Sequence, residues 1–240
     1  ALDKGDKMTD SAASRYLVEQ HFDLFQKLVA QANRYLAAGR YDAAAVYAEI
    51  AANYAMCRHP GLFTSPRLER ILLTIGRQGI RPARPSARGN RFGQMPRHVL
   101  HVLTRALGVG GDTRMVWRWV QQDAERQHSV VLTRQGPVPV PPILRDTVAA
   151  AKGQVYVLNA RRGNLLTWAR ALREIAATRH PVVDMVILHV HPYDVIPFLA
   201  FSDKRTTPPV VYADHADHAF WIGAGISDVD EAGAALAARI

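Results

Sequence analysis

The last six-tenths of the chain alternates short β-branched runs with helical stretches, and this alternation restricts the folds open to it. Runs with the length and composition of strands occur at 97–104, 128–133, 154–158, 183–189 and 208–213. Helical patterns lie between and after them, near 113–126, 141–151, 164–178 and 193–202. Strands that alternate with helices at this spacing are typical of βαβ units and a parallel sheet. The sequence therefore predicts an α/β protein whose residues 97–240 form a Rossmann-like, doubly wound parallel sheet.

The first third of the chain has a helical period instead. Apolar residues recur at intervals of three and four from 14 to 55, and the stretch AAGRYD at 37–42 interrupts them. Gly39 fits the end of one helix and Asp42 the start of the next, which predicts an antiparallel helical hairpin. We expect a third helix at 66–78. The prediction is thus a helical segment over 14–78, preceded by a disordered leader over 1–13.

The stretch GIRPARPSARGNRFGQMP, residues 79–96, is rich in proline, glycine and arginine, and it predicts a basic linker. The whole chain has a formal net charge of +9, which favours anionic partners. Acidic lipid headgroups and nucleotide-linked substrates both fit, while a merely solvated linker is the plainer alternative. No nucleic-acid partner is expected, because the arginines are not interleaved with aromatic residues.

Several features point to the cytoplasm. No window approaches the roughly 18 uninterrupted apolar residues of a membrane-spanning helix. The first residues lack the apolar core of a signal peptide. Cys57 is the single cysteine, so no internal disulfide can form, as suits a reducing compartment. We expect a cytoplasmic protein whose basic linker contacts the inner face of the membrane.

A glycine turn follows the first expected strand. Gly108, Gly110 and Gly111 stand directly before a helix that opens near residue 112 or 113. Glycines allow close approach of the backbone to a ligand, and the N–H groups of a helix N-terminus bind phosphate or carboxylate. Arg114 lies in the first helical turn, within reach of the same anion. The spacing departs from the dinucleotide fingerprint and the P-loop lysine is absent, so a purely structural turn is the alternative.

Histidines and aspartates follow the fourth and fifth expected strands. They are His189, His191 and Asp194 in LHVHPYD, and His215, Asp217 and His218 in ADHADHAFWIG. Ligands of doubly wound sheets bind beyond the carboxyl ends of the strands, where the glycine turn also lies. These residues are therefore predicted to line one edge of the sheet. Helix capping or a buried polar role is the alternative for His215 and His218.

Zinc binding is a competing interpretation, because histidines and aspartates at this spacing supply suitable ligands. The metallo-β-lactamase pattern H-x-H-x-D-H, however, requires aspartate and histidine where Tyr193 and Asp194 stand. A serine nucleophile in a G-x-S-x-G turn is absent, and Cys57 lies in the helical segment. We therefore expect neither a metal nor covalent acyl chemistry.

Three stretches, taken in order and spacing, resemble a known family. They are HVLTRALGVGGDTRMVWRWV, DMVILHVHPYD and PPVVYADHADHAFWIG, and the resemblance covers roughly residues 97–228. The sequence is similar there to the N-terminal half of retaining glycosyltransferases of the family-4 type, which have the GT-B fold of two Rossmann domains. The resemblance implies transfer of a sugar from a nucleotide-sugar to a glycan or glycolipid acceptor with retention of configuration, without a bound metal or other cofactor.

The resemblance also implies roles for individual residues. The glycine loop approaches the donor diphosphate and sugar, which corresponds to Gly110 and Gly111. A histidine near the transferred sugar corresponds to His191, with His189 close behind, and His215 corresponds to the position after the fifth strand. The predicted catalytic residues are His191, His215 and Asp194. The predicted substrate-binding residues are Gly110, Gly111, Arg114, His189, Asp217 and His218.

A GT-B enzyme needs a second Rossmann domain that binds the nucleotide. The residues after the linker are enough for only one Rossmann domain. We therefore expect the acceptor-side half of such an enzyme, with the C-terminal donor-binding domain in the same polypeptide or in another. Two alternatives stay open. One is a non-catalytic binding module in which the helical hairpin recruits a partner, and the other is a metal-dependent hydrolase.

Overall fold

A computed structural model describes residues 4–81, 96–178, 182–213 and 218–228 of the chain, with the side chains of α1 described from residue 13 onward. The helices in these ranges are α1 (Lys4–Ala37), α2 (Tyr41–Cys57), α3 (Pro66–Gly79), α4 (Gly111–Gln122), α5 (Pro142–Ala150), α6 (Leu165–Thr178) and α7 (Val195–Ala200), with a 3-10 turn at Leu158–Ala160. The strands are β1 (His98–Leu103), β2 (Gln127–Leu132), β3 (Val155–Val157), β4 (Met185–His189) and β5 (Val210–Tyr212).

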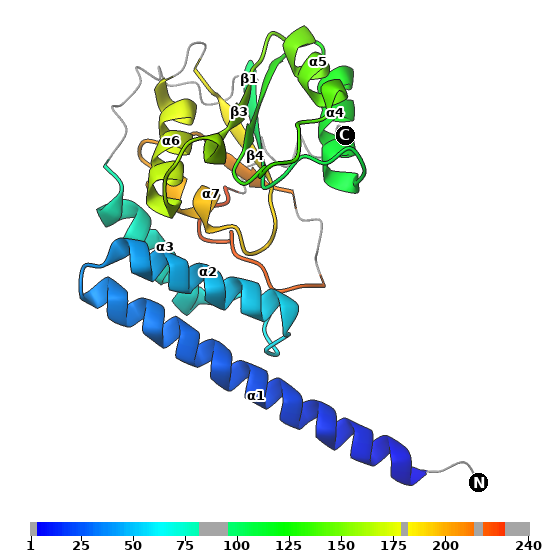
Figure 1. Ribbon diagram of the computed structural model, residues 1–240, viewed down its shortest axis with the longest axis vertical. Coiled ribbons are helices and arrows are strands. Elements are labelled where there is room, and N and C mark those ends of the chain that lie inside the picture. Colours follow the sequence, from blue (N-terminus) through cyan, green and yellow to red (C-terminus); the bar gives the residue numbers. More distant parts are fainter. Residues whose placement is uncertain (1–3, 82–95, 179–181, 214–217, 229–240) are drawn as a thin grey trace.

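The five strands form one parallel sheet in the order β3-β2-β1-β4-β5. The chain winds outward from β1 to β3, then crosses back to β4 and β5 on the other side of β1. Helices α4 and α5 cover one face of the sheet, and α6 and α7 cover the other (Figure 1). The predicted α/β class and doubly wound sheet are confirmed, and each strand lies within two residues of its predicted bounds.

The central strands are buried on both faces, which explains their nearly continuous apolar sequences. Leu100 and Val102 of β1 point into the larger core, which also contains residues of α6 and α7. Leu103 points the other way, into a smaller core with α4 and α5. The alternate residue His101 shares that second face, and its role is described below.

The helical segment packs on the α6–α7 side of the sheet (Figure 1). Phe25 of α1 contacts Phe220 from the segment after β5, with ring centroids 5.4 Å apart. The predicted hairpin is present: α1 and α2 are antiparallel neighbours, and Gly39 between them has a φ of +69°. Leu68, Leu72 and Ile75 of α3 lie in the same core as the sheet residues. The helices therefore form a base under the sheet.

The N-terminal helix is longer than the sequence pattern predicts. We expected a disordered leader over 1–13, but α1 begins at Lys4. The prediction relied on apolar periodicity, which starts only near Leu17. The preceding residues contain no proline and several good helix formers, so their local propensity extends the helix beyond its packed part. The N-terminal part of α1 extends away from the other elements (Figure 1).

The domain boundaries stay predictions. Helix α3 ends at Gly79, where the basic linker was predicted to begin. Residues 82–95 of that linker lie outside the described ranges.

Candidate functional site

Asp194, which follows β4, is hydrogen-bonded to residues at the carboxyl ends of β1 and β2 and to the start of α7. Its Oδ2 accepts hydrogen bonds from the hydroxyl of Thr104, after β1, at 2.8 Å and from that of Thr133, after β2, at 2.5 Å. Its Oδ1 accepts from the backbone N–H of Ile196 at 3.1 Å and so caps α7, which follows β4. Asp194 is 2% exposed. Both carboxylate oxygens are thus occupied, and in this structure Asp194 positions the strand ends.

The segment that leads from β1 to the glycine turn is hydrogen-bonded to the histidine loop at Thr104. Thr104, where the turn after β1 starts, also accepts a hydrogen bond from the backbone N–H of His191, at 2.9 Å. The crossover from β3 back to β4 makes this the switch point of the sheet, where ligands of doubly wound proteins bind. The imidazole of His191 is exposed and stacks on Tyr193, with ring centroids 5.6 Å apart and planes 10° apart. The His191 side chain therefore lies beside Tyr193 and is accessible to solvent.

The glycine turn leaves the N-terminus of α4 open. Gly110 caps the helix with a φ of +143°, which only glycine adopts readily, and no side chain caps α4 at that residue. A Cβ atom added at Gly110 or Gly111 would meet nothing within 4 Å, so the space beside the turn is free. Arg114, in the first turn of α4, is exposed. The helix end can therefore take an anion.

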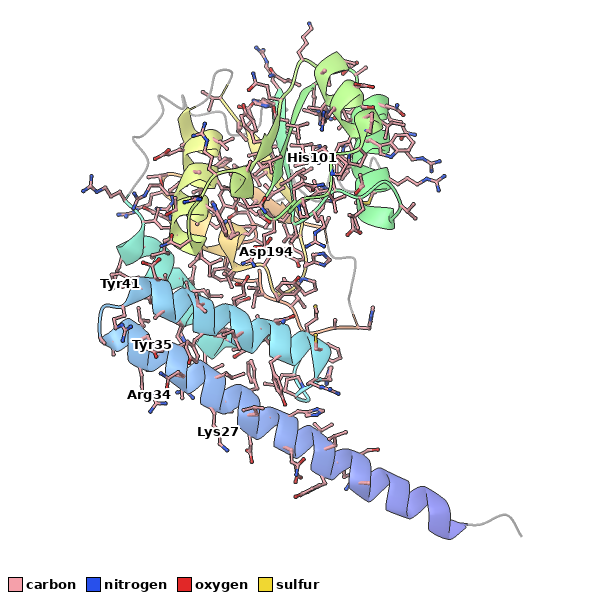
Figure 2. The ribbon with its side chains drawn as sticks, viewed as in Figure 1. Lys27, Arg34, Tyr35, Tyr41, His101 and Asp194 are labelled. Carbon is pink, nitrogen blue, oxygen red and sulfur yellow. The ribbon has the colours of Figure 1, made fainter. Side chains whose placement is uncertain are left out.

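A charged group beside this site was missed in the sequence. Arg134, directly after Thr133, forms a hydrogen-bonded ion pair with Glu49 of α2. Burial raises the pKa of the Glu49 carboxyl, although the neighbouring Arg134 opposes the rise. Burial, and then the charge of Asp194, raise the pKa of Tyr193. In Figure 2, Asp194 lies on the side of His101 that faces α2. Helix α2 thus supplies one wall of the site.

A signal for these residues does exist in the sequence. The sequence Leu-Thr-Arg occurs at the ends of both β1 and β2, at 103–105 and 132–134, with the leucine as the last residue of each strand. The register pairs Leu103 with Leu132, so the two threonines lie side by side and both reach Asp194. The side chain of Arg105 also donates to the backbone carbonyl of Arg134, at 3.4 Å. A repeated tripeptide at two strand ends was therefore a detectable mark of the site.

The residues predicted after β5 are only partly described. His218 is exposed, whereas His215 and Asp217 lie outside the described residues. The segment that follows returns to the histidine loop, because the backbone N–H of Ile222 donates to the carbonyl of Pro192 at 3.1 Å. This segment therefore runs beside the loop that carries His191.

His189 occupies a different position from His191. Its side chain is 2% exposed and points to the α4 face of the sheet, where its Nε2 lies 3.1 Å from Nδ1 of His101. It therefore lies inside the sheet, behind the edge that carries the other predicted residues. The structure brings Gly110, Gly111, Arg114, His191 and Asp194 to that edge.

The fold and the site define a doubly wound α/β protein with a polar cluster at its switch point. The sequence matches no model of a known protein family, and no match to a curated protein reaches significance. Within the described ranges, histidine, cysteine, aspartate and glutamate form no group of three or more that could hold a metal ion.

Proposed function

We propose that this chain is the acceptor-side half of a retaining glycosyltransferase of the GT-B type. It would take part in transfer of a sugar from a nucleotide-sugar to a glycan or glycolipid acceptor. The observation that supports this most is the pair of hydrogen bonds made by the Thr104 hydroxyl. It donates to Asp194 and accepts from the backbone N–H of His191, and so joins the His191 loop to the segment that leads to the glycine turn. An anion-binding helix end and an exposed histidine thereby share one edge of the sheet.

The chemistry of sugar transfer suits this arrangement. Cleavage of the bond between sugar and diphosphate leaves negative charge on the diphosphate and positive charge on the sugar. The N–H groups at the start of α4, near Gly111, and the side chain of Arg114 would stabilise the departing diphosphate. His191 would hold a hydroxyl of the sugar through its exposed edge. Asp194 would act by fixing the loop, since its own oxygens are engaged.

The residues after β5 complete the proposal. His215, at the position that the resemblance implies, and its neighbours Asp217 and His218 would contact the sugar or the acceptor. Reaction without an enzyme nucleophile relies on orientation of the two substrates, which requires both halves of a GT-B enzyme. The donor-binding half would come from the same polypeptide or from a partner. The present chain alone should transfer little or no sugar.

Contact with a membrane surface is part of the same proposal. In the described part of the chain, no helix combines the length and apolar character that crossing a bilayer requires. The basic linker would instead attract anionic headgroups, with each nearby Lys or Arg adding about 1 kcal/mol. Vesicles rich in phosphatidylserine should retain the protein at low salt and release it at high salt. Equal retention by uncharged vesicles would contradict this part of the proposal.

The transfer reaction itself can be tested on the natural polypeptide or complex that contains this chain. A panel of nucleotide-sugars is supplied with glycan and lipid extracts, and release of nucleoside diphosphate is measured. We expect release from one donor, unchanged by a chelator and reduced roughly 100-fold by His191→Ala, because a sugar contact is lost. His59→Ala, an exposed histidine of the helical segment, is the matched control. Absence of release from every donor, or full loss with the chelator, would refute the proposal.

A further inference from the structure

Three histidines from neighbouring strands form a hydrogen-bonded row inside the sheet. His101 of β1 is the middle member: its Nδ1 lies 3.1 Å from Nε2 of His189 on β4, and its Nε2 lies 3.0 Å from Nδ1 of His128 on β2. The centroids of neighbouring rings are 5.3 Å apart and their planes are inclined by 25° and 27°, so the rings lie edge to edge with their nitrogen atoms facing one another. All three side chains are buried, and Trp119 of α4 packs edge-on against His101 and His189. The proposed sugar transfer does not use this row.

The contacts of Asp123 determine which nitrogen of each histidine ring carries the proton. Nε2 of His128 lies 3.2 Å from both the backbone carbonyl oxygen and Oδ2 of Asp123. Neither oxygen can donate, so this Nε2 carries the proton. Nδ1 of a neutral His128 is then an acceptor, which requires His101 to donate from its own Nε2. The same reasoning makes His189 donate from Nε2 to His101. Each neutral ring is therefore protonated on Nε2, and Nδ1 of His189 is an acceptor.

The two ends of the row lie at opposite edges of the sheet. Asp123 follows α4 and precedes β2, so it lies at the amino edge, where its side chain is 14% exposed and pairs with Arg126 at 2.6 Å. His189 is the last residue of β4 and stands two residues before His191, at the carboxyl edge. The row thus runs from a partly exposed carboxylate at the amino edge to the last residue of β4, which precedes the loop that carries His191.

We propose that Asp123, His128, His101 and His189 form a proton relay through the sheet, between the candidate site and solvent at the opposite edge. When Nδ1 of His189 accepts a proton, its Nε2 proton passes to His101. The Nε2 proton of His101 then passes to His128, and that of His128 passes to the Asp123 carboxylate. One proton enters, one arrives at Asp123, and each ring is left protonated on Nδ1. Flow in reverse restores the first state.

The surroundings of the row fit this role. Desolvation holds the pKa of His101 well below its ordinary value, and His189 and His128 beside it act in the same direction. Desolvation also lowers the pKa of His128. The charge of Asp123 opposes this lowering, whereas the charge of Arg126 lowers the pKa further. Burial therefore favours the neutral form of both rings. The relay requires no particular reaction at the site, so it stands whether or not sugar transfer is correct.

Histidine NMR with ¹⁵N labelling tests the relay on the unaltered chain. At about pH 8, all three rings should carry the proton on Nε2, given an ordinary histidine pKa of about 6.5. On acidification, Nδ1 of His101 and of His189 should become protonated with the same midpoint as His128, below that ordinary value. Separate midpoints, Nδ1 protonation already at about pH 8, or no change in any ring down to about pH 5 would overturn the proposal.

Two variants sharpen the result. His101→Gln removes the middle ring, so His128 should still titrate while His189 no longer responds at that midpoint. His98→Gln is the matched control, because His98 lies on the opposite face of β1, where its Nε2 lies 2.9 Å from the hydroxyl of Ser129. It should leave the shared midpoint intact. A response of His189 that persists in His101→Gln would overturn the relay. Where that variant does not fold, the titration of the unaltered chain decides.

Discussion

The guanidinium of Arg173, on α6, is almost completely buried, and it holds together segments that are far apart in the sequence. It donates to backbone carbonyls at the end of α3, among them Gly76 at 2.9 Å, and at the end of α7, among them Ala200 at 2.8 Å. Arginine stays charged in proteins, although desolvation lowers the pKa of Arg173. One side chain therefore satisfies carbonyl groups at two helix ends that have no partner within their own helices.

Replacement of Arg173 by methionine should destabilise the fold strongly. The carbonyl groups of Gly76 and Ala200 would stay buried without a donor, and we expect a loss of about 3–5 kcal/mol in the free energy of unfolding. Urea denaturation measures the loss. Arg170→Met, an exposed position on the same helix, should change stability by less than about 0.5 kcal/mol. Equal effects of the two substitutions would show that the buried bonds contribute little.

The histidine row predicts how stability depends on pH. The pKa values of His101 and His128 are lower in the folded chain than in the unfolded chain. The unfolded chain therefore binds more protons on acidification, so the stabilisation is fully present above about pH 6.5 and is lost as the pH falls through the folded pKa values. Each histidine contributes up to about 1.4 kcal/mol per pH unit in that window. Denaturation curves of His101→Gln should show a shallower pH dependence, and an unchanged slope would contradict this.

At the scale of elements, the loop between β4 and α7 is fixed by Asp194 and the two threonines. Asp194→Asn keeps the size of the side chain but replaces one carboxylate oxygen with an amide NH2 group. In the unaltered chain, one of these oxygens accepts from Thr104 and Thr133, and the other accepts from the backbone N–H of Ile196. We expect a loss of about 1–3 kcal/mol, as for a buried hydrogen bond left incomplete. Thermal or urea unfolding provides the measurement, with the exposed Asp146→Asn as control. Stability equal to that of the unaltered chain would mean that this network does not hold the strand ends.

The strands and most helices could be predicted because their periodicity is local. The polar network could not, since it depends on register: Thr104 and Thr133 are 29 positions apart, and only the pairing of Leu103 with Leu132 aligns them. The role of His189 was missed for the same reason. Alternation in β4 places its side chain on the α4 face, and a partner for it is visible only once β1 lies alongside.

At the scale of the whole molecule, the helical base and the sheet are joined by polar contacts as well as by a shared core. Glu69 of α3 accepts hydrogen bonds from the backbone N–H groups of Gly223, at 2.8 Å, and Gly225, at 2.8 Å, in the segment after β5. Glu49 of α2 pairs with Arg134 at the end of β2. The helices therefore hold two of the segments that border the candidate site, which explains why a mostly helical segment accompanies the sheet.

Hydrogen exchange measured by mass spectrometry, with and without nucleotide-sugars, tests the central claim that the glycine turn and the His191 loop form one site. In the natural polypeptide or complex, the productive donor should protect peptides spanning 105–114 and 190–196 together. Their protection should rise with the same dependence on donor concentration, because both segments border one bound ligand. Protection of only one of them, or of neither, in the presence of a donor that is turned over would contradict the account.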